Sequence, residues 1–134
     1  MAAMPLEMIE ARSLISRLST ASFLVDPGGT LLYFNEPAAE LLGVSFEEAG
    51  RMEAGTWGTR FRPREVSGRE LPVEELPLSV AVQSGQPGFA RMQITSADGS
   101  ERQIEVSAFP IMGSDGQVGA LAIFWPVGED EGES

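Results

Sequence analysis

The side chains that could carry out chemistry in this sequence are carboxylates, hydroxyls, arginines and a single tyrosine. Its 134 residues include no Cys and no His, and all nine basic residues are Arg. The chain therefore has no thiolate nucleophile, disulfide or Cys-ligated metal, and it lacks the commonest general base and metal ligand. Without Lys it also has no Schiff-base chemistry.

Adjacent carboxylates remain the strongest catalytic candidates. They occur at Glu47–Glu48 and at Glu74–Glu75. Successive residues of a helix point about 100° apart, so neither pair converges on one substrate. We expect solvated acidic helix faces here, no catalytic or metal-binding residues, and no enzyme.

The net charge and the hydropathy of the chain limit which partners it can bind and where it is expected to be located. The 9 basic and 20 acidic residues give a net charge of −11, which disfavours binding to nucleic acid or to an anionic membrane. The longest apolar run, residues 118–127, is much shorter than the roughly 20 residues of a membrane-spanning helix. No signal peptide is recognisable at the N-terminus, so we expect a cytoplasmic protein.

The elements that would position these groups begin with an amphipathic helix over residues 4–19. Its apolar stripe contains Met4, Met8, Ala11, Ile15 and Leu18 at helical spacing. The same stripe fits two interpretations, a helix packed on its own domain and a contact between two copies of the chain.

A hairpin and two capped helices follow. Strand-like residues 21–26 and 30–35 flank a cluster of turn formers at residues 26–29. Asn35 is placed to cap a helix that ends at Gly43. Ser45 and Glu48 have the spacing of a capping box for a second short helix.

The middle of the chain is less regular. Residues 51–71 show no periodicity and hold five of the nine arginines, interleaved with Glu53, Glu65 and Glu70. We interpret them as a solvated, ion-paired surface and not as an anion-binding patch. Residues 72–84 are helical in pattern, and Pro77 indicates a kink or a late start.

The last third predicts three strands, at residues 89–95, 102–109 and 118–125, separated by turns at residues 97–100 and 113–116. The final strand is apolar on both faces, which is typical of a central strand or of one covered by another element, such as the N-terminal helix. The element order predicts an α+β fold with a five-stranded antiparallel sheet and its short helices in the middle of the chain.

Three stretches together resemble the PAS sensory domain, from about Ser22 to Trp125. They are residues 23–43 (FLVDPGGTLLYFNEPAAELLG), residues 68–85 around the longer helix, and the last strands with turns at Asp98–Gly99 and Asp115–Gly116. The resemblance implies a PAS fold, with short helices on one face of the sheet and the N-terminal amphipathic helix added. The domains would be a cap helix (1–20), a PAS-like domain (21–127) and a disordered acidic tail (128–134).

The C-terminal end departs from the family pattern. Many PAS domains end in an Asp-Ile-Thr-like motif that leads to a downstream helix, but residues 124–128 read Phe-Trp-Pro-Val-Gly. An acidic tail follows. We expect a stand-alone PAS domain on this ground, and the alternative is a piece of a longer protein that ends before its effector.

The composition limits which PAS cofactors are possible. Without Cys or His the chain cannot hold a cysteinyl flavin, a cysteine-linked chromophore or a His-ligated haem. The cofactor stays unknown, and a non-covalent flavin or a fatty-acid-like ligand remains possible. The resemblance places the ligand between sheet and helices, against Trp57, Phe61, Leu78, Val82, Met92, Ile94, Ile104, Val106, Leu121 and Ile123.

Two functions remain open. The first is a sensory module of bacterial cytoplasmic signal transduction that binds a small apolar or mixed ligand and acts as a homodimer. The second is a ligand-free interaction module with a side-chain-filled core. In both, a partner or ligand would shift the population of helix-against-sheet arrangements and be read by a downstream protein in trans. The candidate dimer residues are Met8, Ala11, Ile15, Leu18 and Phe124.

Overall fold

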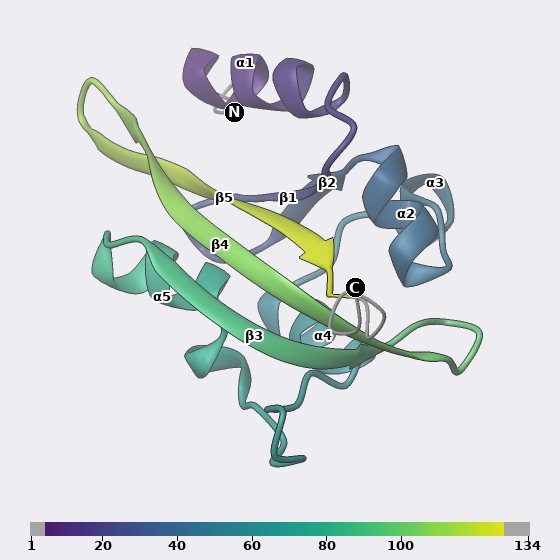
Figure 1. Ribbon diagram of the computed structural model, residues 1–134. Coiled ribbons are helices and arrows are strands. Elements are labelled where there is room, and N and C mark those ends of the chain that lie inside the picture. Colours follow the sequence, from purple (N-terminus) through teal and green to yellow (C-terminus); the bar gives the residue numbers. More distant parts are fainter. Residues whose placement is uncertain (1–4, 128–134) are drawn as a thin grey trace.

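A computed structural model describes residues 5–127 of the chain (Figure 1). Its strands are β1 (Ala21–Val25), β2 (Leu31–Phe34), β3 (Gly88–Thr95), β4 (Glu101–Gly113) and β5 (Gly116–Pro126). They form one antiparallel sheet in the order β2-β1-β5-β4-β3. The helices are α1 (Leu6–Ile15), α2 (Glu36–Leu42), α3 (Phe46–Ala49), α4 (Ala54–Arg60), the 3₁₀ turn η1 (Val73–Glu75) and α5 (Pro77–Ser84). The expected acidic tail lies outside the described residues.

The two faces of the sheet are covered by different parts of the chain. Figure 1 shows α1 on one side and α4 and α5 on the other. A large apolar core lies between the sheet and the helices of the middle segment. A second, smaller cluster lies between the sheet and α1, around Met8, Ile15, Leu24 and Leu121. The predicted architecture is thus confirmed, with an N-terminal helix that ends at Ile15, four residues earlier than expected.

The turn between β1 and β2 forms as its residue types require. The Asp26 carboxylate accepts hydrogen bonds from the backbone N–H groups of Gly28 (2.9 Å) and Thr30 (3.0 Å). Gly29 adopts a φ of 89°, a conformation that residues with a Cβ rarely take. The hairpin therefore brings β2 back beside β1 within a few residues.

Asn35 joins three elements at the end of β2. Its Oδ1 accepts from the N–H of Ala38 (3.2 Å), which caps α2 as predicted. The same oxygen accepts from the N–H of Ser22 in β1 (3.0 Å). Its Nδ2 donates to the carbonyls of Ile15 (2.8 Å) and Thr20 (2.9 Å). Because the side chain is only 1% exposed, these bonds hold the segment after α1 against the sheet without competition from water.

The short helices begin and end largely at the predicted residues. Ser45 and Glu48 form the capping box of α3, and α2 ends at Gly43. Pro77 is the first residue of α5, so the late start is correct, and Gly85 ends this helix with a φ of 70°. The helix α4 was not predicted. Its sequence, Ala-Gly-Thr-Trp-Gly-Thr-Arg, is poor in helix formers, and it forms where Trp57 packs into the core.

The strands β4 and β5 are longer than expected and pair along most of their length, from Ile104↔Pro126 to Gly113↔Gly116. Gly119 of β5 leaves room for the Met8 thioether of α1, because an added Cβ would lie 2.6 Å from its Sδ. Across residues 5–127, no helix has the length and apolar character needed to cross a membrane.

Candidate functional site

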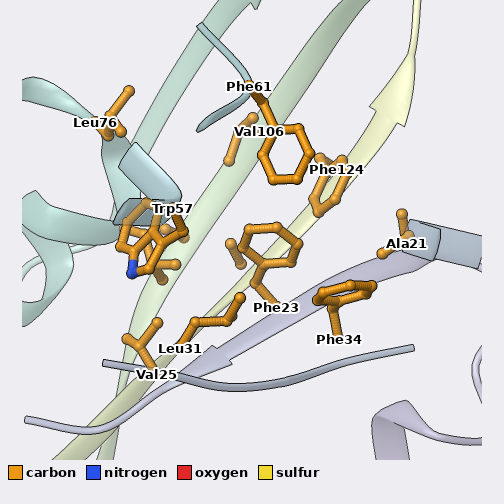
Figure 2. Packing of buried hydrophobic residues seen from close by; sticks show 14 of the residues in the cluster. Ala21, Phe23, Val25, Leu31, Phe34, Trp57, Phe61, Leu76, Val106 and Phe124 are labelled. Carbon is orange, nitrogen blue, oxygen red and sulfur yellow. The ribbon is translucent and has the colours of Figure 1, made fainter. Parts of the chain in front are cut away.

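The candidate site is built around an aromatic cluster on the inner face of the sheet (Figure 2). Phe23 of β1 lies at its centre. The ring centroid of Phe23 is 5.1 Å from that of Phe124 and 6.4 Å from that of Trp57, both in edge-on geometry, and 5.6 Å from that of Phe34. Such pairs stabilise a core beyond the burial of area alone.

A cavity of about 70 Å³ lies beside this cluster, between the sheet and the segment from α4 to α5. Every residue around it is apolar. They are Phe23, Leu42, Trp57, Phe61, Pro63, Leu76, Pro77, Leu78, Met92, Ile94, Ile104, Val106, Ala122 and Phe124.

The one polar side-chain atom in this lining already has a partner. The indole Nε1 of Trp57 donates to the carbonyl of Gly29 at 2.8 Å. The lining therefore offers a ligand apolar contacts and no free polar side-chain group. Within residues 5–127, no cluster of three or more acidic side chains could hold a metal ion.

The structure brings most of the predicted ligand-binding residues together around this cavity. These are Trp57, Phe61, Leu78, Met92, Ile94, Ile104 and Val106. Val82 is half-buried and packs against the same core, but it does not line the cavity. Phe23 was not among the predicted residues, because β1 (Ala-Ser-Phe-Leu-Val) is buried along its whole length and no regular alternation of apolar and polar residues marks its inner face.

The predicted orientation of β5 is wrong. Leu121 and Ile123 pack on the outer face, in the cluster with α1, whereas Ala122 and Phe124 line the cavity. The register explains this, because Phe23 pairs with Ala122 and paired residues share a face of the sheet. Since β5 is apolar on both faces, its own sequence does not distinguish the two orientations.

The predicted dimer residues are engaged within the chain. Met8, Ile15 and Phe124 are 1%, 0% and 4% exposed, so their assignment to a free dimer surface is wrong. Ala11 and Leu18 are partly buried in the same outer cluster. The stripe packs on its own sheet, because this sheet face is itself apolar and would otherwise be open to water.

Apolar side chains do remain exposed on the outer side of the molecule. On α1 these are Leu6, Ile9 and Leu14, at 64%, 51% and 56% exposure. On β3, β4 and β5 they are Phe89, Phe109 and Trp125, at 63%, 37% and 38%. We call these six residues the outer apolar surface.

A polar pair lies across the strands of this surface. Arg91 of β3 donates to the Glu105 carboxylate of β4, and the Trp125 indole donates to the same carboxylate at 3.0 Å. The hydrogen bonds from Arg91, followed by that from Trp125, lower the pKa of Glu105 below its usual value. Glu105 is therefore held as a carboxylate at neutral pH.

The expectation of an ion-paired arginine-rich segment is met in part, since among the described residues Arg64 and Arg69 form ion pairs and the other three arginines of residues 51–71 do not. Arg69 pairs with Glu65, within the segment, and with Glu75, outside it. Arg64 pairs with Glu101 of β4. The hydrogen bonds from Arg69 and Ser67 lower the pKa of Glu65, and the two carboxylates raise the pKa of Arg69.

Comparison with known proteins assigns this fold and core to a family. A sequence profile described as "PAS domain" matches residues 19–125. The chain belongs to the PAS domain family. A search of curated protein sequences finds no significant match.

Solved structures with the same fold come from diverse proteins. The PAS domain of Bordetella pertussis BvgS superposes with a TM-score of 0.62 at 17% identity, over 95% of this chain and 90% of that one. A Rhodobacter sphaeroides LOV protein gives a TM-score of 0.73 at 17% identity, over 94% and 70%. The PAS domain of the fruit-fly ELK potassium channel gives 0.69 at 11% identity, over 89% and 95%. These likenesses show the fold, and the family match over residues 19–125 makes the chain a PAS-domain sensory module of the kind found in signalling proteins.

Proposed function

We propose that this PAS domain is a non-enzymatic interaction module whose core is filled by its own side chains. The observation that supports this proposal is the size of the cavity, about 70 Å³. Pockets that hold drug-sized ligands measure roughly 300–1,000 Å³. The ligand-free interaction module, one of the two functions left open by the sequence, is therefore favoured over a sensor that binds a large ligand.

A bound flavin does not fit the cavity. One structural neighbour is titled for a flavin analogue in a light-oxygen-voltage domain, and flavins carry polar ring edges and a large planar ring. The apolar lining offers no polar side chain to such edges, and the volume is too small for the ring. The same volume disfavours a long fatty-acid-like chain.

A small apolar ligand is the second candidate function. A dry cavity of 150 Å³ lined by aliphatic and aromatic residues is known to bind benzene or xenon. The cavity here is about half that size, and Met92 in its lining can change shape at low cost. The ligand class is thereby narrowed to compact molecules without charge or hydrogen-bonding groups.

The partner in the first proposal would bind the outer apolar surface. Exposed apolar residues that gather on one face of a folded domain mark interaction sites, and Phe89, Phe109 and Trp125 come from the neighbouring strands β3, β4 and β5. We propose a homodimer, the commonest symmetric assembly, with a downstream signalling protein as a partner in trans. Signalling would follow from a shift in the population of α1 positions against the sheet, in the bacterial cytoplasm.

Native mass spectrometry of the purified chain, with an absorbance spectrum and a denatured control, tests the absence of a ligand. We expect a dimer mass without an adduct and a colourless protein. A mass excess that disappears on denaturation would contradict the filled core, and its size would identify the ligand class.

Light scattering coupled to size-exclusion chromatography tests whether the outer apolar surface forms the dimer interface. Phe89→Asp should convert the dimer to a monomer, because it places a charge at the most exposed aromatic residue of the sheet. Val66→Asp is the matched control, since Val66 is 59% exposed but lies in the loop between α4 and η1. A wild-type monomer, or a dimer unaffected by Phe89→Asp, would refute the proposed interface.

A further inference from the structure

The segment of residues 61–76, which we call the strap, forms part of the cavity wall. It connects α4 to α5, and its two ends reach the cavity through Phe61 and Pro63 on one side and Leu76 on the other. Between these ends the chain runs out to an exposed tip at residues 66–68 and returns. A movement of the strap would therefore change the size of the cavity.

Backbone hydrogen bonds fold the strap on itself. The N–H of Leu71 donates to the carbonyl of Pro63 (2.9 Å), and the N–H of Glu65 donates to the carbonyl of Arg69 (2.8 Å). Near Pro63 the strap is also joined to β3, because Arg64 and Gln93 exchange two backbone hydrogen bonds of 2.8 Å. The Pro63 end is thus fixed to the sheet.

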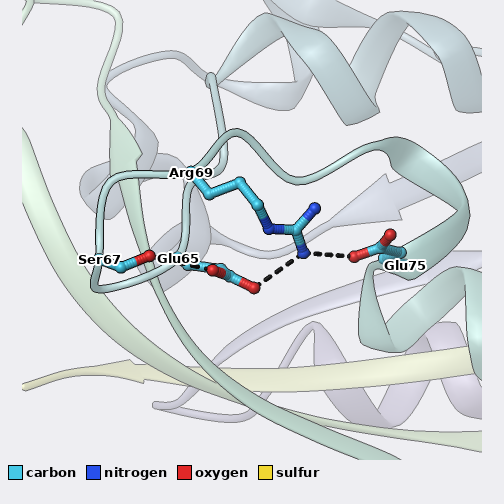
Figure 3. A network of polar contacts seen from close by, with 4 residues as sticks. All are labelled: Glu65, Ser67, Arg69 and Glu75. Carbon is cyan, nitrogen blue, oxygen red and sulfur yellow. Dashed lines mark hydrogen bonds and ion pairs between the residues drawn. The ribbon is translucent and has the colours of Figure 1, made fainter.

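The Leu76 end is held differently. Figure 3 shows the Arg69 guanidinium between two carboxylates. The distance from Arg69 Nη2 is 2.8 Å to Glu65 Oε2 and 2.7 Å to Glu75 Oε1. Ser67 Oγ donates to the other oxygen of Glu65 at 3.0 Å. Glu75 immediately precedes Leu76, so Arg69 connects the anchored half of the strap to the residue that closes the cavity wall.

We propose that Arg69 is a clasp that holds the strap closed over the cavity, and that release of Glu75 lets Leu76 move outward and admits a small apolar molecule. This inference deepens the second candidate function, since it describes how the same cavity opens. The three side chains of the clasp are 51%, 40% and 47% exposed, so each ion pair is weak. A weak clasp suits a gate, because a ligand can shift a nearly balanced equilibrium with a small differential affinity.

Amide hydrogen exchange of wild type and Arg69→Gln tests the clasp directly. We expect the Glu75 and Leu76 amides of the variant, which donate to the carbonyls of Pro72 and Val73, to exchange about two- to fivefold faster, with β4 amides unchanged. Arg91→Gln is the matched control, because it breaks an ion pair with Glu105 on the opposite face of the sheet. The control should leave exchange in the strap at the wild-type rate.

Toluene titration tests whether the open strap admits a ligand. The methyl resonances of Ile104 and Val106 report on the cavity, and Arg69→Gln should bind toluene about two- to fivefold more tightly than wild type and Arg91→Gln.

Strap exchange equal to wild type in Arg69→Gln, or an equal rise in β4, would overturn the clasp. Faster amide exchange in the strap with an unchanged affinity for toluene would overturn the role of the Arg69 clasp in the entry of a ligand into the cavity. A ligand retained in native mass spectrometry would refute the filled core while leaving the exchange result valid, so the two failures are distinguishable.

Discussion

Replacing Gly119 by alanine places a methyl group where β5 has no room for one. An added Cβ would lie 2.5 Å from the carbonyl oxygen of Val25 and 2.6 Å from the Sδ and Cε of Met8. The end of the Met8 side chain can rotate away. The Val25 carbonyl cannot, because it belongs to β1, which pairs with β5 and β2.

The cost follows from these contacts. Forcing a methyl group into a packed site destabilises a protein by about 1–3 kcal/mol. Replacing a strand glycine by alanine otherwise gains roughly 0.5–1 kcal/mol from the lower entropy of the unfolded chain. We expect a net loss of about 1–2 kcal/mol in the free energy of unfolding, with α1 displaced from the sheet.

The assay is urea denaturation followed by tryptophan fluorescence and circular dichroism. Gly55→Ala is the matched control, because Gly55 lies in the exposed part of α4, has no atom within 4 Å of an added Cβ and has no positive φ. This substitution should stabilise the fold by about 0.5–1 kcal/mol. If Gly119→Ala is as stable as wild type, or if both substitutions shift stability in the same direction, the reasoning about α1 packing is refuted.

Three further predictions concern the cap, the cavity and the outer face. Asn35→Ala should lower the free energy of unfolding by about 2–4 kcal/mol in urea, because it removes a helix cap and takes from the buried Ser22 N–H the side-chain oxygen that it donates to. It also removes one of the two hydrogen bonds that each of the Ile15 and Thr20 carbonyls accepts. A loss below 1 kcal/mol would contradict this. Val106→Ile should raise the thermal midpoint, because one methylene buried in the cavity contributes about 0.8 kcal/mol; a lower midpoint would mean that the cavity has no free space. Glu105→Gln should destabilise the fold at pH 7. Because the pKa of Glu105 is lowered in the folded state, its carboxylate contributes to the free energy of unfolding, and this contribution is lost when the group is protonated. The difference in stability between the variant and wild type should therefore disappear as the pH falls well below 4.5, the ordinary pKa of Glu. Denaturation midpoints across pH measure this, and a difference that persists in acid would refute the ion-pair explanation.

Features that depend on neighbouring residues can be predicted from the sequence. The β1–β2 turn, the Asn35 cap, the capping box of Ser45 and Glu48 and the start of α5 at Pro77 all match. In each case the hydrogen bonds or the backbone restriction act within about four residues, so residue type and spacing are sufficient. The PAS family and the sheet with its five strands follow from the order of these signals.

The tertiary structure decided what depends on residues far apart in the chain. The helix α4 has weak propensity and forms around Trp57, whose indole donates to Gly29, 28 residues earlier. The face of β5 that meets the cavity is set by its register with β1, about 100 residues away in sequence. An apolar residue suits either face of the sheet equally well, so the apolar sequence of β5 does not show which of its faces meets the cavity.

The volume of the cavity is likewise a tertiary property. Half of its lining was predicted, and alternation identifies the four inner residues of β3 and β4, which are Met92, Ile94, Ile104 and Val106. The space left between those side chains depends on how Phe23, Trp57 and Phe124 pack together, and a difference of one methylene changes it. Residue types thus determined that the core is apolar, and only the packing of distant segments decided how little room it leaves for a ligand.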